Sequence, residues 1–305
     1  MISSFRELVE RTKDLEAKRI AVAGAESKDV LLALMRAKSF GIAEPLLLGS
    51  EPMIKSRASE LGMDLGGILL YNKVSANESA KAAVKLVTSS QADLIMKGMI
   101  STAEIVKAVL KKSSGLRTDR ILSHIMVYEI PGYRRFVLVT DAAVNIAPSL
   151  QHKIDILRNA IHVARSLGIK QPKIAALAAL EKVNPDMPST VEAAELTKMG
   201  QAGNFGDCIV DGPLALDDAL NPETARKKGV SSPVSGGADI LLAHDLESAN
   251  LLGKSIAYIG QAAYAGVIMG AKVPLIIVGR GSTPASMLHA IALGVVIASS
   301  ENNEH

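Results

Sequence analysis

The sequence contains no tryptophan and few aromatic residues of any kind. Phenylalanine, tyrosine and tryptophan together make up 3% of its 305 residues. Proteins that bind single-stranded nucleic acids stack the bases on aromatic side chains, and sugar-binding clefts also depend on aromatic faces. This composition argues against both kinds of site, and the core has to be built from alanine, valine, isoleucine, leucine and methionine.

Cysteine is nearly absent, and long apolar runs are missing. Cys208 is the single cysteine, so no disulfide can form within the chain and a cysteine-based metal site would lack partners. No apolar run approaches the roughly 20 residues that are needed to span a bilayer. The N-terminal stretch is amphipathic and contains acidic residues, unlike a secretion signal. We therefore expect a protein of the reducing cytoplasm, with no membrane partner.

The chain also lacks an excess of charge of one sign. It has 34 lysine and arginine residues against 31 aspartate and glutamate residues, which gives a formal net charge of +3. The basic residues are spread along the chain and form no tail or stripe, so a nucleic-acid partner is not expected. A modest positive excess suits a small anionic substrate better.

Short apolar runs alternate with amphipathic segments along the chain, a pattern typical of α/β proteins. The apolar runs of the first part are predicted strands at 18–25, 43–50, 68–72 and 92–98. Residues 121–128 and 134–140 flank a Pro-Gly turn, so these two strands are predicted to pair antiparallel. The alternation then resumes, with predicted strands at 173–180, 207–213, 238–245 and 272–279.

Polar side chains follow most of the predicted strands, for example at Thr140-Asp141 and at His244-Asp245. In open α/β sheets, ligands bind at the C-terminal ends of the strands. We therefore take as candidates for the walls of a binding cleft Lys97, Ser101, Thr102, Asn145, Glu181, Asn184, Asp211 and Asp245. Their individual roles follow from position alone, and a solvated loop is the alternative for each.

Two of these stretches carry a more specific signal. Residues 97–102 (KGMIST) put a lysine at a strand end and Ser-Thr at a helix start, where free N–H groups suit an anion. Ordinary N-capping by Ser101 is the alternative. Arg280 lies between two glycines after an apolar strand, so its guanidinium and the backbone could approach a phosphate together. The alternative there is a surface arginine in a flexible turn.

Several well-defined catalytic motifs are missing. The chain has no P-loop, and no G-x-G-x-x-G follows the first strand. The histidines show neither H-E-x-x-H nor another paired-ligand spacing, and no G-x-S-x-G elbow occurs. These absences argue against nucleotide hydrolysis, metal-dependent proteolysis and a serine-hydrolase triad.

Taken together, several strand-end segments resemble the phosphate acetyl/butyryltransferase family. The resemblance runs in order from about residue 18 to about residue 298, and its specificity comes from the agreement of many separate segments. The segments are KGMISTAEIVKAVL (97–110), GLRTDRILSH (115–124), VTDAAVNIAPSL (139–150), AALEKVNPDMPST (178–190), DGPLALDDAL (211–220), DILLAHDLESANLLGKS (239–255) and LIIVGRGSTPASMLHAIALG (275–294).

The resemblance implies two doubly wound α/β/α domains around a cleft, like those of the isocitrate and isopropylmalate dehydrogenases. The first domain would contain residues 1–143 and 282–305, and the second residues 144–281. The implied protein is a homodimer or a larger homo-oligomer. The implied reaction moves a short acyl group (butyryl, acetyl or branched) between coenzyme A and inorganic phosphate, giving acyl phosphate. It uses no cofactor and no metal; acyl-CoA and phosphate are the substrates.

The resemblance also implies site residues, and here the chain departs from the family pattern. The family's Ser-Arg pair, which binds phosphate and the reacting carbonyl, falls on Gly279 and Arg280, so its hydroxyl is missing. The acid that the acetyltransferase branch uses as a base falls on Ser286. The catalytic candidates are then Arg280, Asp245, Ser282 and His289. Arg117 and Gly279 join the substrate-binding candidates.

Two other interpretations remain open at this level. The departures at Gly279 and Ser286 could mark a divergent member that binds CoA or acyl phosphate with altered or lost turnover. A metal- and NAD(P)-dependent hydroxy-acid dehydrogenase of the same fold would need an acidic cluster for Mg²⁺ or Mn²⁺. The candidate acids for such a cluster are Asp211, Asp217, Asp239 and Asp245.

Overall fold

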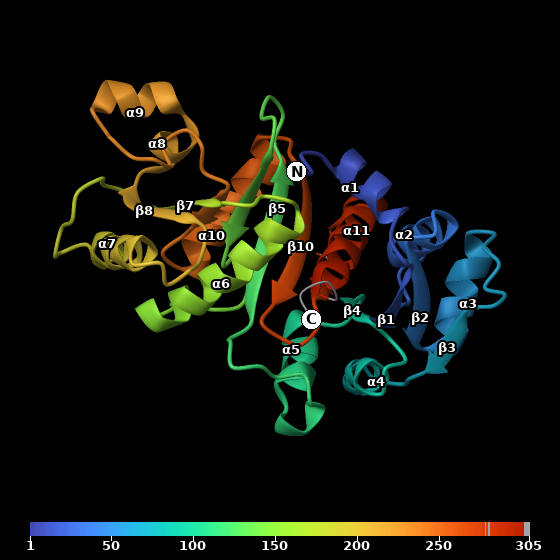
Figure 1. The fold of residues 1–305 in the computed structure, drawn as a ribbon. Helices are drawn as coiled ribbons and strands as arrows, with labels where there is room; N and C mark the ends of the chain where they lie inside the picture. Colours follow the sequence, from blue (N-terminus) through green and yellow to red (C-terminus); the bar gives the residue numbers. More distant parts are fainter. Residues whose placement is uncertain (278, 280, 302–305) are drawn as a thin grey trace. The chain divides into compact units, whose positions relative to one another are not determined.

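The computed structural model describes all residues except 278, 280 and 302–305, and the described chain forms two compact units (Figure 1). The N-terminal unit contains Phe5–Arg120 and the chain from Tyr264 onward; the central unit contains Met1–Ser4 and Ile121–Ala263. Strands and helices alternate in both, which confirms the predicted α/β class. The predicted domain division, 1–143 with 282–305 and 144–281, puts its boundaries at other positions and stays a prediction.

The N-terminal unit is built on strands in the order β3-β2-β1-β4-β11-β10. All neighbouring pairs are parallel except β10 with β11. The chain runs from β1 outward to β2 and β3 and then places β4 on the other side of β1, so the strand order reverses between β1 and β4. The strands are β1 (Lys18–Ala23), β2 (Ala43–Gly49), β3 (Leu69–Asn72), β4 (Leu94–Lys97), β10 (Ala263–Met269) and β11 (Leu275–Ile277).

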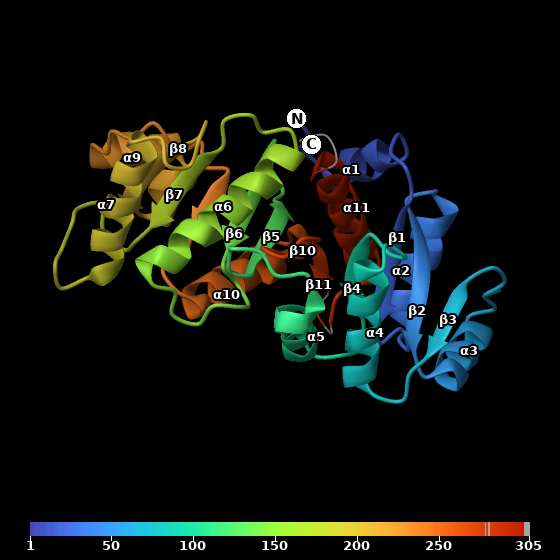
Figure 2. The same ribbon diagram turned by 60° about the horizontal axis from the view of Figure 1, so that its bottom comes forward.

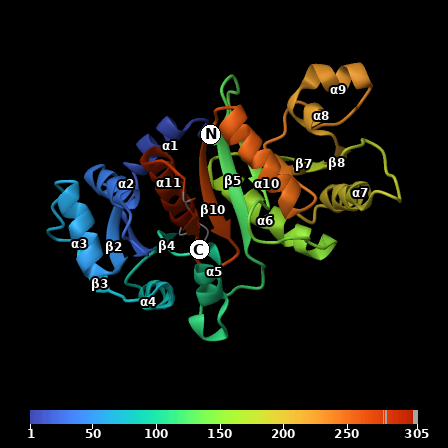
Figure 3. The ribbon, with the colours of Figure 1, turned by 180° about the vertical axis from the view of Figure 1, so that it is seen from behind.

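Helices cover both faces of this sheet, as Figures 1 and 3 show from opposite sides. Helix α11 contacts α1 and α2, whereas α4 contacts α5. Covered on both faces, β1 and β4 read as nearly continuous apolar runs, and residues such as Val22 and Ile95 are fully buried. The helices are α1 (Phe5–Thr12), α2 (Lys28–Ser39), α3 (Glu51–Glu60), α4 (Ala76–Thr88), α5 (Thr102–Leu110), the 3-10 turn η1 (Lys112–Ser114) and α11 (Pro284–Glu301).

The central unit has strands in the order β5-β6-β9-β7-β8. β5 pairs antiparallel with β6, which confirms the hairpin predicted around the Pro-Gly turn, and the other pairs are parallel. Because β6 pairs with β9, the hairpin belongs to this unit, which therefore begins before residue 144. The chain goes from β7 to β8 and then returns to place β9 on the other side of β7. The strands are β5 (Ser123–Glu129), β6 (Phe136–Thr140), β7 (Lys173–Leu177), β8 (Ile209–Leu214) and β9 (Ile240–Leu242).

Helix α6 lies across β5 and β6 in the central unit and also contacts α7 (Figure 2). No helix of the described chain is long and apolar enough to cross a membrane. The helices of this unit are α6 (Leu150–Ser166), α7 (Pro188–Gln201), α8 (Leu216–Leu220), α9 (Pro222–Lys228), α10 (Leu246–Lys254) and the π-helical turn η2 (Ser255–Ile259).

Three elements are absent from the sequence-based prediction. Strand β10 begins with Ala-Tyr-Ala-Gly, in which alanine and glycine have poor strand propensity, and it follows a helix almost directly. Helices α8 and α9 have 5 and 7 residues, too few for a helical period to be recognised. The helical segment that follows β9 is divided between α10 and the π-helical turn η2, so its last turn is wider than an α-helix.

His289 lies where α11 meets α1. Its ring stacks on that of Phe5, with the ring centroids 4.3 Å apart and the planes at 2°. Burial lowers the pKa of His289 to about 4, and its Nδ1 has no hydrogen-bond partner among the described residues. These surroundings are those of a residue that packs two helices together, and the predicted catalytic role of His289 stays a prediction.

We expect His289 to contribute to destabilisation by acid. The pKa of this side chain is about 4 in the folded protein against an ordinary value of 6.5, so the unfolded chain takes up its proton first. Stability that is fully present above pH 6.5 is therefore lost as the pH falls toward 4, by up to about 3 kcal/mol from this group. The variant His289→Phe should lose less thermal stability over this interval than the wild type, measured as Tm by circular dichroism.

The exposed residue His152 on α6 provides the control for this comparison. The variant His152→Phe should follow the wild type across the same pH interval. If the Tm of His289→Phe falls as steeply as that of the wild type, the buried imidazole is not a source of the acid sensitivity.

Candidate functional site

The first candidate site lies where β1 and β4 end in the N-terminal unit. Ala23 is paired with Lys97 there, and the N–H groups of Gly98 and Met99 donate to the carbonyl oxygens of Ala23 (2.8 Å) and Gly24 (2.7 Å). A Cβ atom on Gly98 would lie 2.0 Å from the carbonyl oxygen of Gly24, so only glycine permits this approach. Ligands of open α/β sheets bind at such a reversal of strand order.

Lys97 and Ser101 hold the loop between β4 and α5. Lys97 is 5% exposed, and its Nζ donates to the carbonyl oxygens of Gly98 (3.2 Å) and Ile100 (3.3 Å). Ser101 and Glu104 form a capping box, in which the hydrogen bonds from the N–H and Oγ of Ser101 lower the pKa of Glu104. The carboxylate of Glu104 therefore already lies at the start of α5, where an anion could have bound. Of the two predictions for Ser101, the structure shows N-capping.

The segment after β11 reaches the same edge of the sheet, because Ile277 is paired with Lys97. Gly279 and Ser282 close a turn there: the N–H of Gly279 donates to Oγ of Ser282 (3.0 Å), and the N–H of Ser282 donates to the carbonyl oxygen of Gly279 (3.1 Å). Ser282 is buried. Arg280, the central residue of the predicted phosphate site, lies outside the described residues.

The other candidates of the N-terminal unit have different surroundings. Thr102 is the first residue of α5 and is half-buried. Arg117 is exposed and forms an isolated antiparallel bridge with Ala271. Together with His289 in the contact between α1 and α11, these residues add nothing to the turn that Gly279 and Ser282 form. Their predicted roles stay predictions.

In the central unit, Asp141 organises the loop that follows β6. Its buried carboxylate accepts hydrogen bonds of 2.5–3.1 Å from Nδ2 of Asn145 and from the peptide N–H groups of His124, Ala143, Val144 and Asn145. The amide nitrogen of Asn145 also donates to the carbonyl oxygen of Leu122 at 2.8 Å. The nitrogen of this predicted substrate-binding side chain is therefore used within the loop, and its oxygen is the atom left for a ligand.

Glu181 belongs to a cluster of three carboxylates around one ammonium group. Nζ of Lys228 donates to Glu181 (3.1 Å), Asp217 (3.0 Å) and Asp218 (3.2 Å). Burial raises the pKa of Asp218, whereas the hydrogen bond with Asp218 lowers the pKa of Glu181. The cluster ties the loop after β7 to α8 and α9. Among the described residues, no group of three or more histidine, cysteine, aspartate or glutamate side chains could hold a metal ion.

Three further candidates of the central unit are half-buried and hold local backbone. Oδ1 of Asn184 accepts from the peptide N–H two residues later (3.0 Å), and Oδ1 of Asp211 accepts from the next peptide (2.9 Å). Asp245 caps α10 by accepting the N–H of Ser248 (2.8 Å), which lowers the pKa of Asp245. These bonds leave the second carboxylate oxygen of Asp211 and of Asp245 for a ligand, whereas the single side-chain oxygen of Asn184 is already an acceptor.

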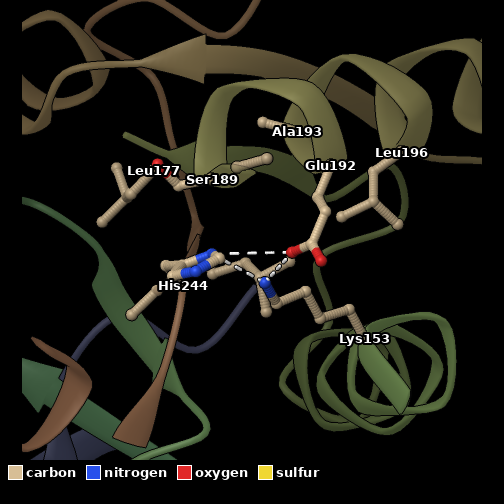
Figure 4. A pocket seen from close by; sticks show the side chains of 10 residues that line it. Lys153, Leu177, Ser189, Glu192, Ala193, Leu196 and His244 are labelled. Carbon is tan, nitrogen blue, oxygen red and sulfur yellow. Dashed lines mark hydrogen bonds and ion pairs between the residues drawn. The ribbon is translucent and has the colours of Figure 1, made fainter. Parts of the chain in front are cut away.

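A pocket of the central unit brings together three ionisable side chains: Lys153 from α6, Glu192 from α7 and His244 after β9 (Figure 4). The pocket has about 190 Å³ of empty space, part of which is open to solvent. Nζ of Lys153 forms an ion pair with Oε2 of Glu192 and lies 2.9 Å from Nδ1 of His244. Burial and the charge of Lys153 lower the pKa of His244.

The structure therefore gathers only part of the predicted site residues. Lys97, Gly279 and Ser282 lie at one edge of the N-terminal sheet. In the central unit the loops of Asn145 and Asp245 are joined by a hydrogen bond from the N–H of Leu246 to the carbonyl oxygen of Ile146 (3.0 Å). Lys153 and Glu192 are missing from the prediction, because each lies inside a helix and no motif marks it.

Comparison with known proteins gives one consistent result. The family model described as "Phosphate acetyl/butaryl transferase" matches residues 4–81 and 71–295. The phosphate butyryltransferase of Clostridium acetobutylicum is 40% identical over 298 residues, which are 98% of this chain and 99% of that protein. The phosphate acetyltransferase of Thermotoga maritima is 38% identical over 294 residues, 96% of this chain and 99% of that protein.

Solved structures agree with the sequence comparisons. A branched-chain phosphotransacylase from Enterococcus faecalis superposes with a TM-score of 0.80 at 31% identity, covering 92% of this chain and 99% of that one. A 4-hydroxythreonine-4-phosphate dehydrogenase from Burkholderia phymatum superposes with a TM-score of 0.54 at 16% identity, covering 92% and 98%. The second likeness concerns the fold alone and agrees with the predicted dehydrogenase-like architecture.

We expect Gly98→Ala to damage the end of β4. The added Cβ would meet the backbone of Gly24, which cannot rotate away as a flexible side chain could. Overpacking of this kind costs typically about 1–3 kcal/mol, and urea denaturation should show a loss of stability of that size or more. Gly66→Ala is the control, since its Cβ would meet only the carboxylate of Asp64, at 3.1 Å. Equal stability of the two variants would contradict the tight contact between the strand ends.

Proposed function

The chain belongs to the phosphate acetyl/butyryltransferase family, and from this membership we propose that it transfers a short acyl group, butyryl in the first place, between coenzyme A and inorganic phosphate. The observation that carries the proposal is the 40% identity with a phosphate butyryltransferase along 98% of the chain. An acetyl or a branched acyl group is the next choice, since an acetyltransferase and a branched-chain phosphotransacylase are also similar.

The reaction makes three demands on the protein. A phosphate oxygen attacks the thioester carbonyl, the carbonyl oxygen gains negative charge, and the C–S bond breaks to release a thiolate that takes up a proton. The protein therefore has to bind phosphate, to stabilise the oxyanion with hydrogen-bond donors, and to handle the thiol proton. The first two demands can be matched to candidate residues at the strand ends.

We assign phosphate binding to Arg280, and Lys97 adds positive charge at the edge of the sheet where β4 ends. Ser282 is the candidate for the hydroxyl that the family places at position 279, because its Oγ lies 3.3 Å from where a Cβ of residue 279 would be. In the central unit, Asn145, Glu181, Asn184, Asp211 and Asp245 remain candidates for contacts with the CoA moiety. His289 is not part of this assignment, because its ring stacks on Phe5.

The remaining features of the proposal concern the setting of the reaction. Acyl-CoA and phosphate are its substrates, and no cofactor or metal has to be added. We propose that the protein works in the cytoplasm as a homodimer or a larger homo-oligomer, without a nucleic-acid or membrane partner. The dehydrogenase alternative is not favoured, because its support is a likeness of fold at 16% identity against 38–40% for the transferases.

We expect purified protein to release free thiol from butyryl-CoA when phosphate is present. The assay follows thiol release by a colour reagent and confirms butyryl phosphate as its hydroxamate, with acetyl-, isobutyryl- and hexanoyl-CoA compared in parallel. Omitting phosphate is the control and should abolish the release. If none of the four thioesters releases thiol in a phosphate-dependent way, the transferase assignment fails, and binding of CoA without turnover would then favour a divergent member.

We also expect Arg280→Gln to impair the use of phosphate. Removal of one preorganised donor to a developing charge typically costs about 10²–10³-fold in rate, and kcat/KM for phosphate should fall by that factor. Arg57→Gln is the matched control, because Arg57 forms only an exposed ion pair with Glu60 within α3. A kcat/KM for phosphate that is unchanged in Arg280→Gln would remove Arg280 from the phosphate site.

A further inference from the structure

Met99 is an exposed apolar side chain at the edge of the N-terminal sheet where β4 ends. It lies in the loop that joins β4 to α5, and its side chain is 55% exposed. Both of its neighbours in the chain, Gly98 and Ile100, are buried. Single exposed apolar residues are common on protein surfaces, so a function for Met99 has to follow from its surroundings.

Hydrogen bonds fix the backbone on both sides of Met99. The N–H of Met99 donates to the carbonyl oxygen of Gly24 (2.7 Å). Nζ of Lys97 donates to the carbonyl oxygens of Gly98 (3.2 Å) and Ile100 (3.3 Å), the residues before and after Met99. A Cβ atom on Gly24 would lie 3.0 Å from the nitrogen of Met99, so the loop is packed directly against the end of β1. The loop therefore holds Met99 at a fixed point of the edge and leaves its side chain uncovered.

The turn that follows β11 begins next to this loop. β11 pairs parallel with β4, and Ile277 lies opposite Lys97. Met99 and Gly279 each come two residues after this pair, beyond the ends of neighbouring strands. Paired strands lie roughly 4.8 Å apart. The loop of Met99 and the turn that Gly279 closes with Ser282 therefore start side by side.

The chemistry of the proposed reaction places the acyl chain close to this turn. Ser282 is the candidate for the hydroxyl that contacts phosphate and the reacting carbonyl. The new bond joins a phosphate oxygen to the carbonyl carbon, so the alkyl chain begins at the atom that phosphate attacks. With C–C bonds of about 1.5 Å, a butyryl chain extends roughly 4 Å beyond this carbon. The apolar surface that receives the chain therefore has to lie beside the turn.

Two other exposed apolar side chains of this edge are too far away. Met53 in the first turn of α3, which follows β2, is 50% exposed, and Val74 after β3 is 91% exposed. The strand order places β2 three strands and β3 four strands from β11, which corresponds to roughly 14 and 19 Å. Met99 follows the strand next to β11. Of these three side chains, Met99 is the one within reach of a butyryl chain that starts at the turn.

We propose that the alkyl part of the acyl group packs against Met99, and that this residue thereby determines which acyl groups the protein accepts. This inference rests on the proposed function. An unbranched side chain with three rotatable bonds and a polarizable sulfur can adapt to alkyl groups of different length and branching. A butyryl group offers two more methylene groups for this contact than an acetyl group, whose methyl ends next to the carbonyl. The contact therefore favours butyryl over acetyl.

The first test measures acyl selectivity in variants of Met99. Met99→Ala removes the side chain beyond Cβ, and the ratio of kcat/KM for butyryl-CoA to that for acetyl-CoA should fall about 10-fold, at the lower end of what an apolar pocket gains from a methylene group. The value for acetyl-CoA should stay close to that of the wild type. Met99→Leu keeps an apolar side chain of similar volume and should retain most of the ratio. An unchanged ratio in Met99→Ala would overturn the proposal.

Met53→Ala is the matched control for these variants. Met53 is a methionine of similar exposure in the same unit, and it follows a strand that is three strands from β11. Its replacement should leave the ratio at the wild-type value. An equal fall of the ratio in Met53→Ala and Met99→Ala would count against a contact specific to the loop after β4.

The second test is a footprint that needs no turnover. Hydrogen peroxide oxidises exposed methionines to the sulfoxide, and mass spectrometry of peptides measures the rate at Met99 and at Met53. The probes are the ketophosphonate analogues of butyryl phosphate and acetyl phosphate, in which a methylene group replaces the bridging oxygen, and inorganic phosphate. We expect the butyryl analogue to slow the oxidation of Met99 several-fold more than the acetyl analogue or phosphate does. None of the three should protect Met53.

The footprint distinguishes failure of this inference from failure of the proposed function. Selective protection of Met99 without any phosphate-dependent thiol release would refute the transferase function and keep the apolar contact. Normal thiol release with equal protection by the two analogues would refute the contact and keep the function. Oxidation of Met99 at the same rate with and without the butyryl analogue overturns the inference, whatever the thiol assay shows.

Discussion

At the ends of β1 and β4, two stretches of backbone approach so closely that no side chain fits between them. A Cβ on Gly98 would lie 2.0 Å from the carbonyl oxygen of Gly24, and one on Gly24 would lie within 3.0 Å of the loop at Met99 and Ile100. This contact brings the start of the loop after β4 directly against the end of β1. The position of Lys97, the cap of α5 and the approach of the segment after β11 all follow from it.

In both units the order of the strands reverses once, but different side chains lie at the reversal. In each, the chain leaves a strand on one side and later adds a strand on its other side, so the strand order reverses there. In the N-terminal unit, close backbone contacts, glycines and the buried Lys97 lie at this reversal. In the central unit, a pocket with the ion pair of Lys153 and Glu192 and with His244 lies there.

The sequence predicts the fold well and the site only in part. Apolar runs and turn residues locate β1, β4 and the hairpin of β5 and β6, because these features are local in the chain. Lys153 and Glu192 cannot be found in this way, because they are 39 residues apart in the sequence and come together only when α6 packs against α7. Ser101 is the opposite case. The sequence allows it either to bind an anion or to cap α5, and the structure shows the cap, in a capping box with Glu104. His289 is predicted as a substitute for a missing catalytic group of the family, and its ring stacks on Phe5 in the structure.

The carboxylate of Asp141 has a consequence for how the chain can vary among homologous proteins. Its partners include the peptide N–H groups of His124, Ala143, Val144 and Asn145, which every amino acid except proline supplies. Apart from Asn145, whose Nδ2 also donates to Asp141, the side chains along this loop are therefore free to diverge as far as this anchor is concerned. Asp141 itself is not, because asparagine offers a single acceptor oxygen and glutamate a longer reach. Homologous proteins would then keep an aspartate at this position while the neighbouring residues of the loop differ.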